Sequence, residues 1–282
     1  LEFRRVLFRS LMHLSLSNLL SANADACKQS LLSVIESQII PQLMHSHPPA
    51  QALSSEPITH DPKGAFSEED IQAFVELCLQ MHLDDALEMV MQAVRQGAAV
   101  ETLYLELITP AARVLGHQWV MDQKDFTSVT HGLMQMHQLT RRLANLALTH
   151  PVKATGNKRI LLASAPGSLH ILGLCIVSEL FRSDGWQVVM EITLTEKDLS
   201  QAVKREWFDV IGLSVGLVEQ LPQLPQLIQH IKQLSLNPGA PLILGGAALL
   251  NVDPSLIDRT QADGIATDAR EAVTLANQLL KN

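Results

Sequence analysis

The stretch RILLASAPGSLHILGLCIVSELFRSDGWQVVMEI, residues 159–192, decides the fold class. It begins with a compact apolar run, RILLAS, which is typical of a strand buried on both faces. A helix-like segment, LGLCIVSELFRSDG, comes next and is followed by a second strand-like run, WQVVMEI. A strand, a helix and a strand in this order predict two parallel strands joined by a right-handed crossover.

The same alternation continues to the end of the chain. Further strands are expected in DVIGLSV, APLILGG and the short DGIAT, and helices in EKDLSQAVKREW, LPQLIQHIKQLS and DAREAVTLANQLLKN. Residues 151–282 are therefore predicted to form a Rossmann-like domain of the α/β class, with a parallel five-stranded, flavodoxin-like sheet.

The preceding part of the chain has a helical period. Four helices joined by short loops are expected within residues 65–150, and an antiparallel four-helix bundle is the natural arrangement for them. Ser67 is expected to cap the first helix, Gly97 to close the second, and Pro110 to kink the third. Residues 1–64 are expected to hold a cloning or sequencing remnant up to about residue 10, a helix and a linker rich in proline and serine.

Composition limits the classes of function. The formal net charge is −8 and there is no long run of lysine and arginine, so direct binding to nucleic acid is not expected. The three cysteines are scattered without a CxxC pair, which favours free thiols in a reducing cytoplasm. No apolar run is long enough for a membrane-spanning helix, so a cytoplasmic protein is expected.

Polar and glycine residues follow three of the predicted strands. SLHILG (Ser168–Gly173) comes after the first strand, SVG (Ser214–Gly216) ends the third, and Gly245 and Gly246 end the fourth. The carboxyl ends of parallel strands share one edge of the sheet, where ligands bind. Glycines there let a ligand approach the backbone closely. Singly, each feature is most often a loop or turn residue, but together they predict a binding site.

The three features resemble the motif of the cobalamin-binding domain, D-x-H-x-x-G followed by S-x-L and G-G. The resemblance implies that His170 coordinates cobalt from below, and Gly173 is the glycine of the motif. Ser214 would contact the displaced nucleotide tail, and Gly245 and Gly246 would line its slot. A neutral imidazole suits cobalt. The expected cofactor is adenosyl-, methyl- or hydroxocobalamin.

Two positions depart from the family's motif. Ser168 replaces the aspartate that orients the histidine ring and raises its basicity, so coordination by His170 is expected to be softer. Gly216 replaces the leucine of S-x-L and alters the slot.

The helical part resembles the cap of cobalamin-dependent sensors and methyltransferases. In photosensing members a W-x9-E-H pattern lies over the upper face of the cofactor. Here Trp119 is followed by His131, with one extra residue between them and Thr130 in place of the glutamate. The resemblance implies that Trp119 shields the upper ligand and that His131 approaches the cobalt. The alternative is that both only pack the bundle. No motif fixes the faces of His117 and His137.

Four segments together resemble the PpaA/AerR family of cobalamin-binding antirepressors: SVIESQIIPQLMHSH, DFTSVTHGLMQMHQL, APGSLHILGLCIVSELFRSDGW and ADGIATDAREAVTLA. The resemblance implies a light-responsive regulator, not an enzyme, whose helical cap shifts against the sheet domain and which acts on a repressor of the PpsR/CrtJ type. Alternatives are a corrinoid carrier of a methyltransferase system, a haem sensor with His170 or a bundle histidine as ligand, and a module that binds no cofactor.

Overall fold

The computed structural model describes residues 65–147, 157–168, 171–192, 195–250 and 259–281. These residues all belong to one compact unit, Lys63–Asn282, which contains both the helical part and the sheet. The expectations for residues 1–64 lie outside the described part of the chain.

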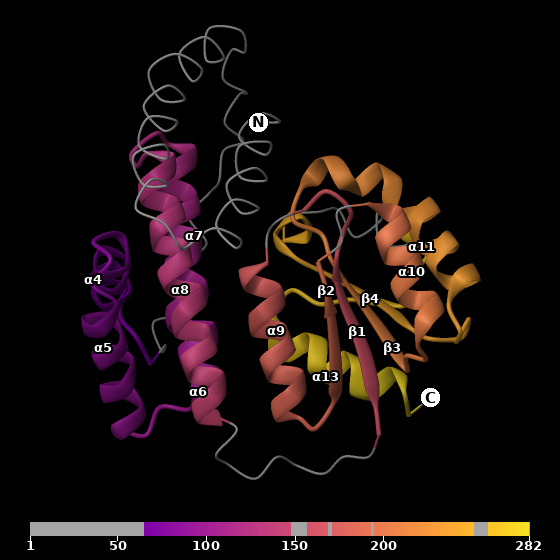
Figure 1. Cartoon of the computed structure of the whole chain (residues 1–282), viewed down its shortest axis with the longest axis horizontal. Helices are drawn as coiled ribbons and strands as arrows, with labels where there is room; N and C mark the ends of the chain where they lie inside the picture. The colour runs from indigo at the N-terminus through magenta and orange to yellow at the C-terminus, as the bar shows by residue number, and fades with distance from the viewer. Residues whose placement is uncertain (1–64, 148–156, 169–170, 193–194, 251–258, 282) are drawn as a thin grey trace, which may run out of the picture. The chain divides into compact units, whose positions relative to one another are not determined.

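The helical part contains the four expected helices (Figure 1). The third is continuous through three segments, a short α-helix, a π-helix and an α-helix. The elements are α4 (Glu68–Leu79), α5 (Leu83–Arg95), α6 (Val100–Thr102), η2 (Leu103–Ile108), α7 (Thr109–Val120) and α8 (Phe126–Ala147).

The local signals in the sequence act as expected at two helix ends. Ser67 caps α4 in a reciprocal capping box with Asp70. Gly97 follows the end of α5 with a φ of 96°, a conformation that glycine adopts without strain. At Pro110 the irregularity takes the form of the π-helix η2, which ends just before it. Proline lacks a backbone N–H and so cannot donate the hydrogen bond of a regular helix. Within this segment, the Thr109 hydroxyl donates a hydrogen bond to the Tyr104 carbonyl oxygen at 2.8 Å.

The sheet has five parallel strands in the order β2-β1-β3-β4-β5, the flavodoxin-like order predicted from the sequence. The strands are β1 (Arg159–Ser164), β2 (Gln187–Glu191), β3 (Val210–Ser214), β4 (Leu242–Gly245) and β5 (Gly264–Ile265). The helical segments between and after them are α9 (Leu172–Ser183), α10 (Glu196–Arg205), η3 (Val218–Gln223), α11 (Leu224–Leu234), η4 (Ala247–Leu249) and α13 (Ala269–Leu279).

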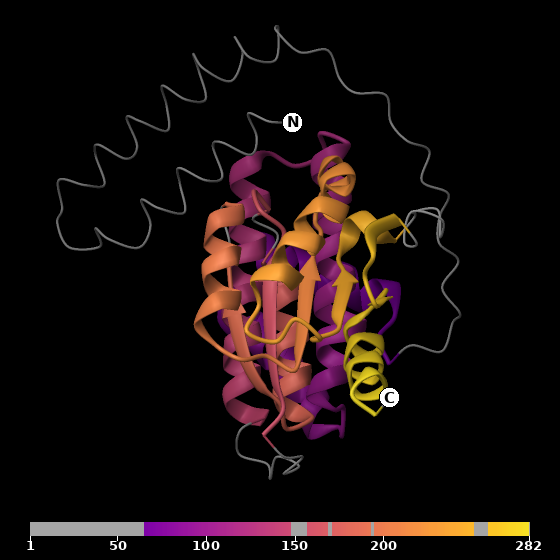
Figure 2. The ribbon, with the colours of Figure 1, turned by 90° about the vertical axis from the view of Figure 1, so that its right-hand side faces the viewer.

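Helices cover both faces of the sheet (Figure 2). On one face, α10 and α11 pack over the sheet around Phe208 and Ile228. On the other, α9 and α13 pack around Phe181 and Trp186, whose rings meet edge to face at 5.3 Å. No helix among the described residues is long and apolar enough to cross a membrane.

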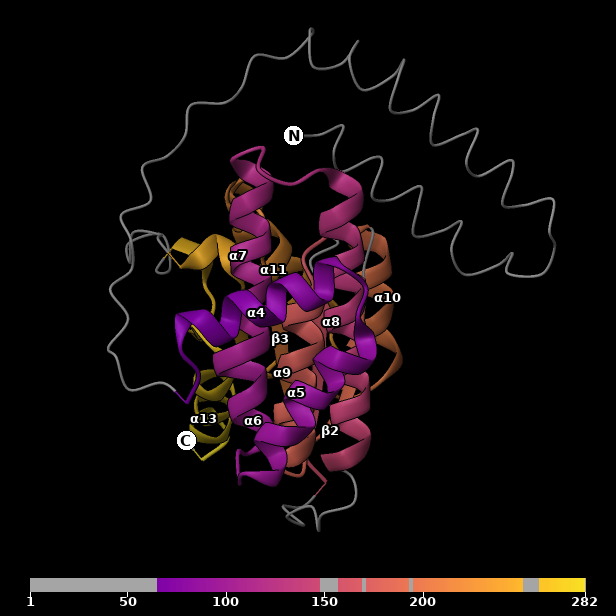
Figure 3. The same ribbon diagram turned by 90° about the vertical axis from the view of Figure 1, so that its left-hand side faces the viewer.

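The bundle shares its core with the sheet domain. Leu172, Ile176 and Leu180 of α9 and Ala269 of α13 belong to the same buried cluster as the apolar side chains of the bundle. Helices α8 and α9 pack against each other, and α4 and α5 lie on the side of α8 away from the sheet (Figure 3). The helical part is therefore packed onto the sheet domain through α9.

Candidate functional site

Backbone pairing brings the strand-end residues of the motif together. Ser214 is in register with Ser164 of β1 and with Gly245 of β4. Beyond the strands, the Ala165 N–H donates to the Ser214 carbonyl oxygen at 2.8 Å, and the Val215 N–H donates to the Gly245 carbonyl oxygen at 2.7 Å. The three features therefore meet at the carboxyl edge of the sheet, as the sequence predicts.

The glycines of this edge differ in whether the fold itself requires a glycine at their position. Gly246 has a φ of 112°, and a Cβ built there would lie 2.8 Å from the Val215 nitrogen, so the turn itself requires glycine. A Cβ at Gly245 would come no closer than 3.4 Å, to the Ala266 carbonyl oxygen. A Cβ at Gly173 would meet nothing within 4 Å. Packing within the described protein does not explain glycine at Gly245 or Gly173, so both positions leave room for a ligand.

The loop after β1 carries Ser168 and, two residues later, His170. Ser168 is 1% exposed and its N–H donates to the Ala165 carbonyl oxygen at 3.0 Å. The serine that stands in the aspartate position is thus built into the base of the loop. His170, the residue predicted to coordinate cobalt, lies outside the described residues.

Gln220 of η3 ties this loop to the end of β3. Its side-chain N–H group donates to the Pro166 carbonyl oxygen at 2.9 Å and to the Ala165 carbonyl oxygen at 3.3 Å. Its side-chain oxygen accepts a hydrogen bond from the Leu217 N–H at 3.1 Å. Sequence reasoning missed Gln220 because its partners are backbone carbonyls more than fifty residues away, which no motif encodes.

Trp119 and His131 come from the connected ends of α7 and α8. Trp119 is half-buried, and its ring lies 6.5 Å from the Phe126 ring, centroid to centroid. His131 follows Phe126 by five residues, which rotates it by about 140° around α8. Phe126 and His131 thus point in different directions from α8. The assignment of Trp119 and His131 to the upper face of a cofactor stays a prediction.

Folding shifts the pKa of His137 on α8. Burial, and then the positive charge of Arg141, lower its pKa from 6.5 to about 4. Its imidazole is therefore neutral around pH 7. Within the described residues, no group of three or more His, Cys, Asp and Glu side chains is arranged to hold a metal ion.

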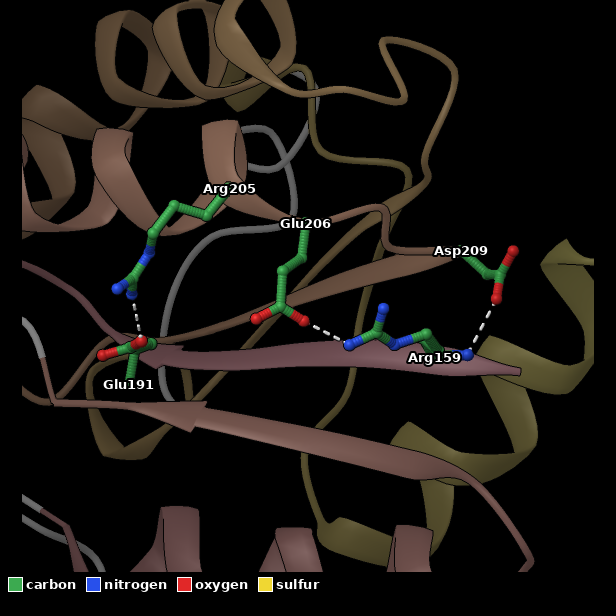
Figure 4. A network of polar contacts seen from close by, with 5 residues as sticks. All are labelled: Arg159, Glu191, Arg205, Glu206 and Asp209. Carbon is green, nitrogen blue, oxygen red and sulfur yellow. Dashed lines mark hydrogen bonds and ion pairs between the residues drawn. The ribbon is translucent and has the colours of Figure 1, made fainter. Parts of the chain in front are cut away.

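A separate polar network joins β1, α10 and β2 (Figure 4). The Arg159 N–H donates to Asp209 Oδ2 at 2.7 Å, and the Arg159 guanidinium pairs with Glu206. Arg205 pairs with Glu191 at 2.9 Å. These ion pairs are partly exposed, and such pairs contribute little stability. We assign them to the fold and not to a site.

Comparisons with known proteins agree with this architecture. Residues 158–276 match the family model of the B12 binding domain, which confirms the resemblance predicted from the motifs. An uncharacterized 20.5 kDa protein in the bchF-crtJ intergenic region of Rhodobacter capsulatus is 27% identical over 169 residues, which are 60% of this chain and 87% of that protein. The dimethylamine corrinoid protein of Methanosarcina barkeri is 28% identical over 153 residues, 53% of this chain and 70% of that protein.

A solved structure shows the same fold. The monomethylamine corrinoid protein of Methanosarcina barkeri superposes with a TM-score of 0.63, covering 75% of this chain and 99% of that one, at 15% identity. At this identity the likeness concerns the fold alone. It spans more of the chain than the sheet domain does, so the helical part is included in the shared architecture.

Proposed function

We propose that this protein is a cobalamin-binding regulator that responds to the state of its cofactor, with light as the expected signal. The observation that carries the proposal is the carboxyl edge of the sheet in the segment that matches the B12 binding domain. Packing would allow a side chain at Gly173 and at Gly245, yet both positions are glycine. Such an edge accepts a large ligand against the backbone.

The residues of this edge fit cobalamin. Ser214 is half-buried at the end of β3 and offers a hydroxyl beside Gly245, which is also half-buried. Apolar side chains that remain exposed follow three strands, Ile192 after β2, Val218 after β3 and Leu250 after β4. Cobalamin supplies a cobalt ion with an exchangeable upper ligand. His170 would hold the cobalt, and Ser214 and the glycines would hold the nucleotide tail.

The output is proposed to pass through a partner repressor of the PpsR/CrtJ type, without direct binding to nucleic acid and without catalysis by this chain. The net charge of −8 disfavours contacts with phosphates. Similarity to the Rhodobacter capsulatus protein, named for its place between bchF and crtJ, supports the proposal of a partner repressor.

A corrinoid carrier of a methyltransferase system is the second candidate. It is favoured by the similarity to the dimethylamine corrinoid protein and by the shared fold with the monomethylamine corrinoid protein. Ser168 argues against it, because a carrier that repeatedly binds and releases the lower ligand needs a proton managed by an acidic partner of the histidine.

The test is an absorption spectrum of protein purified in the dark and incubated separately with hydroxocobalamin, adenosylcobalamin and haemin. We expect a retained corrinoid spectrum that changes on illumination. The His170→Ala variant should lose that spectrum, with thermal unfolding as a check that the variant folds. A retained Soret band without corrinoid would identify a haem sensor. Methyl transfer with a partner enzyme would identify a carrier, and no retained pigment would refute cofactor binding.

A further inference from the structure

A cavity of about 210 Å³ lies between the helical part and the sheet domain. Its walls come from the continuous helix α6–η2, from the end of α9 and from α13, which lie together in the lower part of Figure 1. Helix α9 begins at the carboxyl edge of the sheet and ends at Ser183, so the cavity lies near the opposite edge. Small-molecule sites occur preferentially where separate parts of a fold meet. The cavity is therefore a candidate site distinct from the cofactor edge.

The most buried part of the cavity lining is apolar. Tyr104 is 2% exposed and Leu180 7%, and Val273 packs against both of the buried clusters that meet at α9 and α13. The Tyr104 hydroxyl donates to the Thr140 carbonyl oxygen at 3.2 Å, so the fold already uses it. At roughly 30 Å³ for each water-sized group, the volume holds roughly seven such groups. The cavity thus suits a small ligand with an apolar part.

Charged groups of both signs complete the lining. Arg270 of α13 donates from Nε to Glu101 Oε1 of α6 at 2.6 Å. Its terminal guanidinium N–H groups make no hydrogen bond within the described part of the chain, and such groups bind carboxylates as a planar fork. Asp184, directly after α9, is half-buried, and its carboxylate accepts from Asn277 Nδ2 at 2.7 Å and from Trp186 Nε1 at 3.3 Å. The arginine and the aspartate are thus held at the cavity by neighbouring side chains.

A ligand with one sign of charge fits this lining poorly. An anion at Arg270 would also meet the carboxylates of Glu101 and Asp184, and a cation would meet Arg270. A zwitterion can place its carboxylate on the guanidinium and its ammonium group on the Asp184 carboxylate, with its apolar part against the buried lining. We propose that the cavity binds a free α-amino acid with an apolar side chain of the size of valine or leucine. The inference does not rest on cobalamin binding.

The experiment follows binding of L-leucine to the full chain through its amide chemical shifts in NMR, with thermal unfolding of each sample as a check of the fold. Isocaproate and isoamylamine are the leucine analogues that lack the ammonium group and the carboxylate, respectively. Arg270→Gln removes the guanidinium, and Asp184→Asn removes the charge but keeps an acceptor oxygen for Asn277 and Trp186. Arg95→Gln is the matched control, because Arg95 is an equally exposed arginine paired with a glutamate on α5.

We expect leucine to bind wild type with millimolar affinity, as for other ligands of few atoms, to shift the amides of Val273 and Thr274, and to raise the unfolding temperature. Both analogues should bind wild type at least tenfold more weakly, and so should leucine to Arg270→Gln and to Asp184→Asn, whereas Arg95→Gln should behave like wild type.

The absence of a saturable shift with leucine would overturn the inference. An analogue that binds as tightly as leucine would also overturn it, as would leucine binding that neither variant weakens or shifts confined to the carboxyl edge of the sheet. Titration of the same wild-type sample with hydroxocobalamin tests the proposed function separately, so failure of one does not imply failure of the other.

Discussion

Replacing Gln220 tests whether the loop that carries His170 must be held in place for the cofactor to bind. The side chain donates to the carbonyl oxygens of Ala165 and Pro166 and accepts from the Leu217 N–H. Gln220→Glu keeps the acceptor for Leu217 but removes both donors. It also places a carboxylate against two carbonyl oxygens. Gln220→Ala removes all three contacts.

The size of the effect follows from these contacts. A neutral hydrogen bond contributes about 0.5 to 1.5 kcal/mol net, so the two bonds to the loop are worth roughly 1 to 3 kcal/mol. If the loop without these hydrogen bonds must be ordered when cobalamin binds, the binding free energy is weakened by the same amount. The expected loss of affinity in Gln220→Glu is about 5- to 100-fold, at about 1.4 kcal/mol for each factor of ten.

The assay is titration with hydroxocobalamin followed by absorption, alongside urea unfolding of each apoprotein. Gln223→Ala is the control, because Gln223 is an exposed glutamine at the end of the same short helix. The Gln220→Glu variant should bind hydroxocobalamin at least as weakly as the Gln220→Ala variant. An affinity within about twofold of wild type in both variants, with the fold intact, would refute the argument that the loop must be held.

Further predictions concern stability and the glycines. Gly246→Ala should lower the free energy of unfolding by more than about 1 kcal/mol because of its positive φ and the contact with Val215, as measured by urea unfolding. Gly173→Ala should leave unfolding unchanged or stabilise α9 slightly, yet weaken cobalamin binding in the same titration. Because the pKa of His137 falls from 6.5 to about 4 on folding, the unfolded chain takes up a proton first, and unfolding free energy should fall by up to about 3 kcal/mol as the pH drops from 6.5 to 4. His137→Leu should remove that part of the pH dependence, and an unchanged slope would contradict the assigned burial. Ile176→Ala should cost about 2 to 4 kcal/mol in urea unfolding, because Ile176 is buried in the core that the bundle shares with α9.

The sheet and its edge were predictable because short-range patterns encode them. The alternation of strand and helix defines a parallel sheet, and the carboxyl ends of parallel strands meet at one edge, so Ser214 and Gly245 could be placed together from the sequence. The end of α5 at Gly97 was predictable for the same reason, since its φ of 96° is a property of that residue's own backbone.

The remaining features depend on contacts between distant segments. Gln220 is an ordinary polar residue in the sequence, and its importance comes from loop carbonyls that only the folded chain brings near it. The sequence indicated an irregularity at Pro110 but not that a π-helix would absorb it. The sequence also does not show which element packs against each face of α8, and the contact of Phe126 with Trp119 shows this for one of those faces.

The shared core constrains how a cofactor signal can leave the protein. The expected sliding of the whole helical part against the sheet would separate Leu172, Ile176 and Leu180 from the bundle. Exposing three such side chains costs roughly 5 to 9 kcal/mol, a cost that a change confined to one end of the bundle avoids. The connection between α7 and α8 is different, since Val120 is 69% and Met121 53% exposed there. A local change at this end, beside Trp119, breaks few buried contacts and alters an apolar surface that a partner protein can recognise. We therefore expect the regulatory output at the α7–α8 connection, with the rest of the bundle fixed on α9. Under the proposed function, Met121→Asp should abolish binding to the proposed repressor partner while leaving the affinity for hydroxocobalamin unchanged. Loss of both would contradict a separate output surface at the α7–α8 connection.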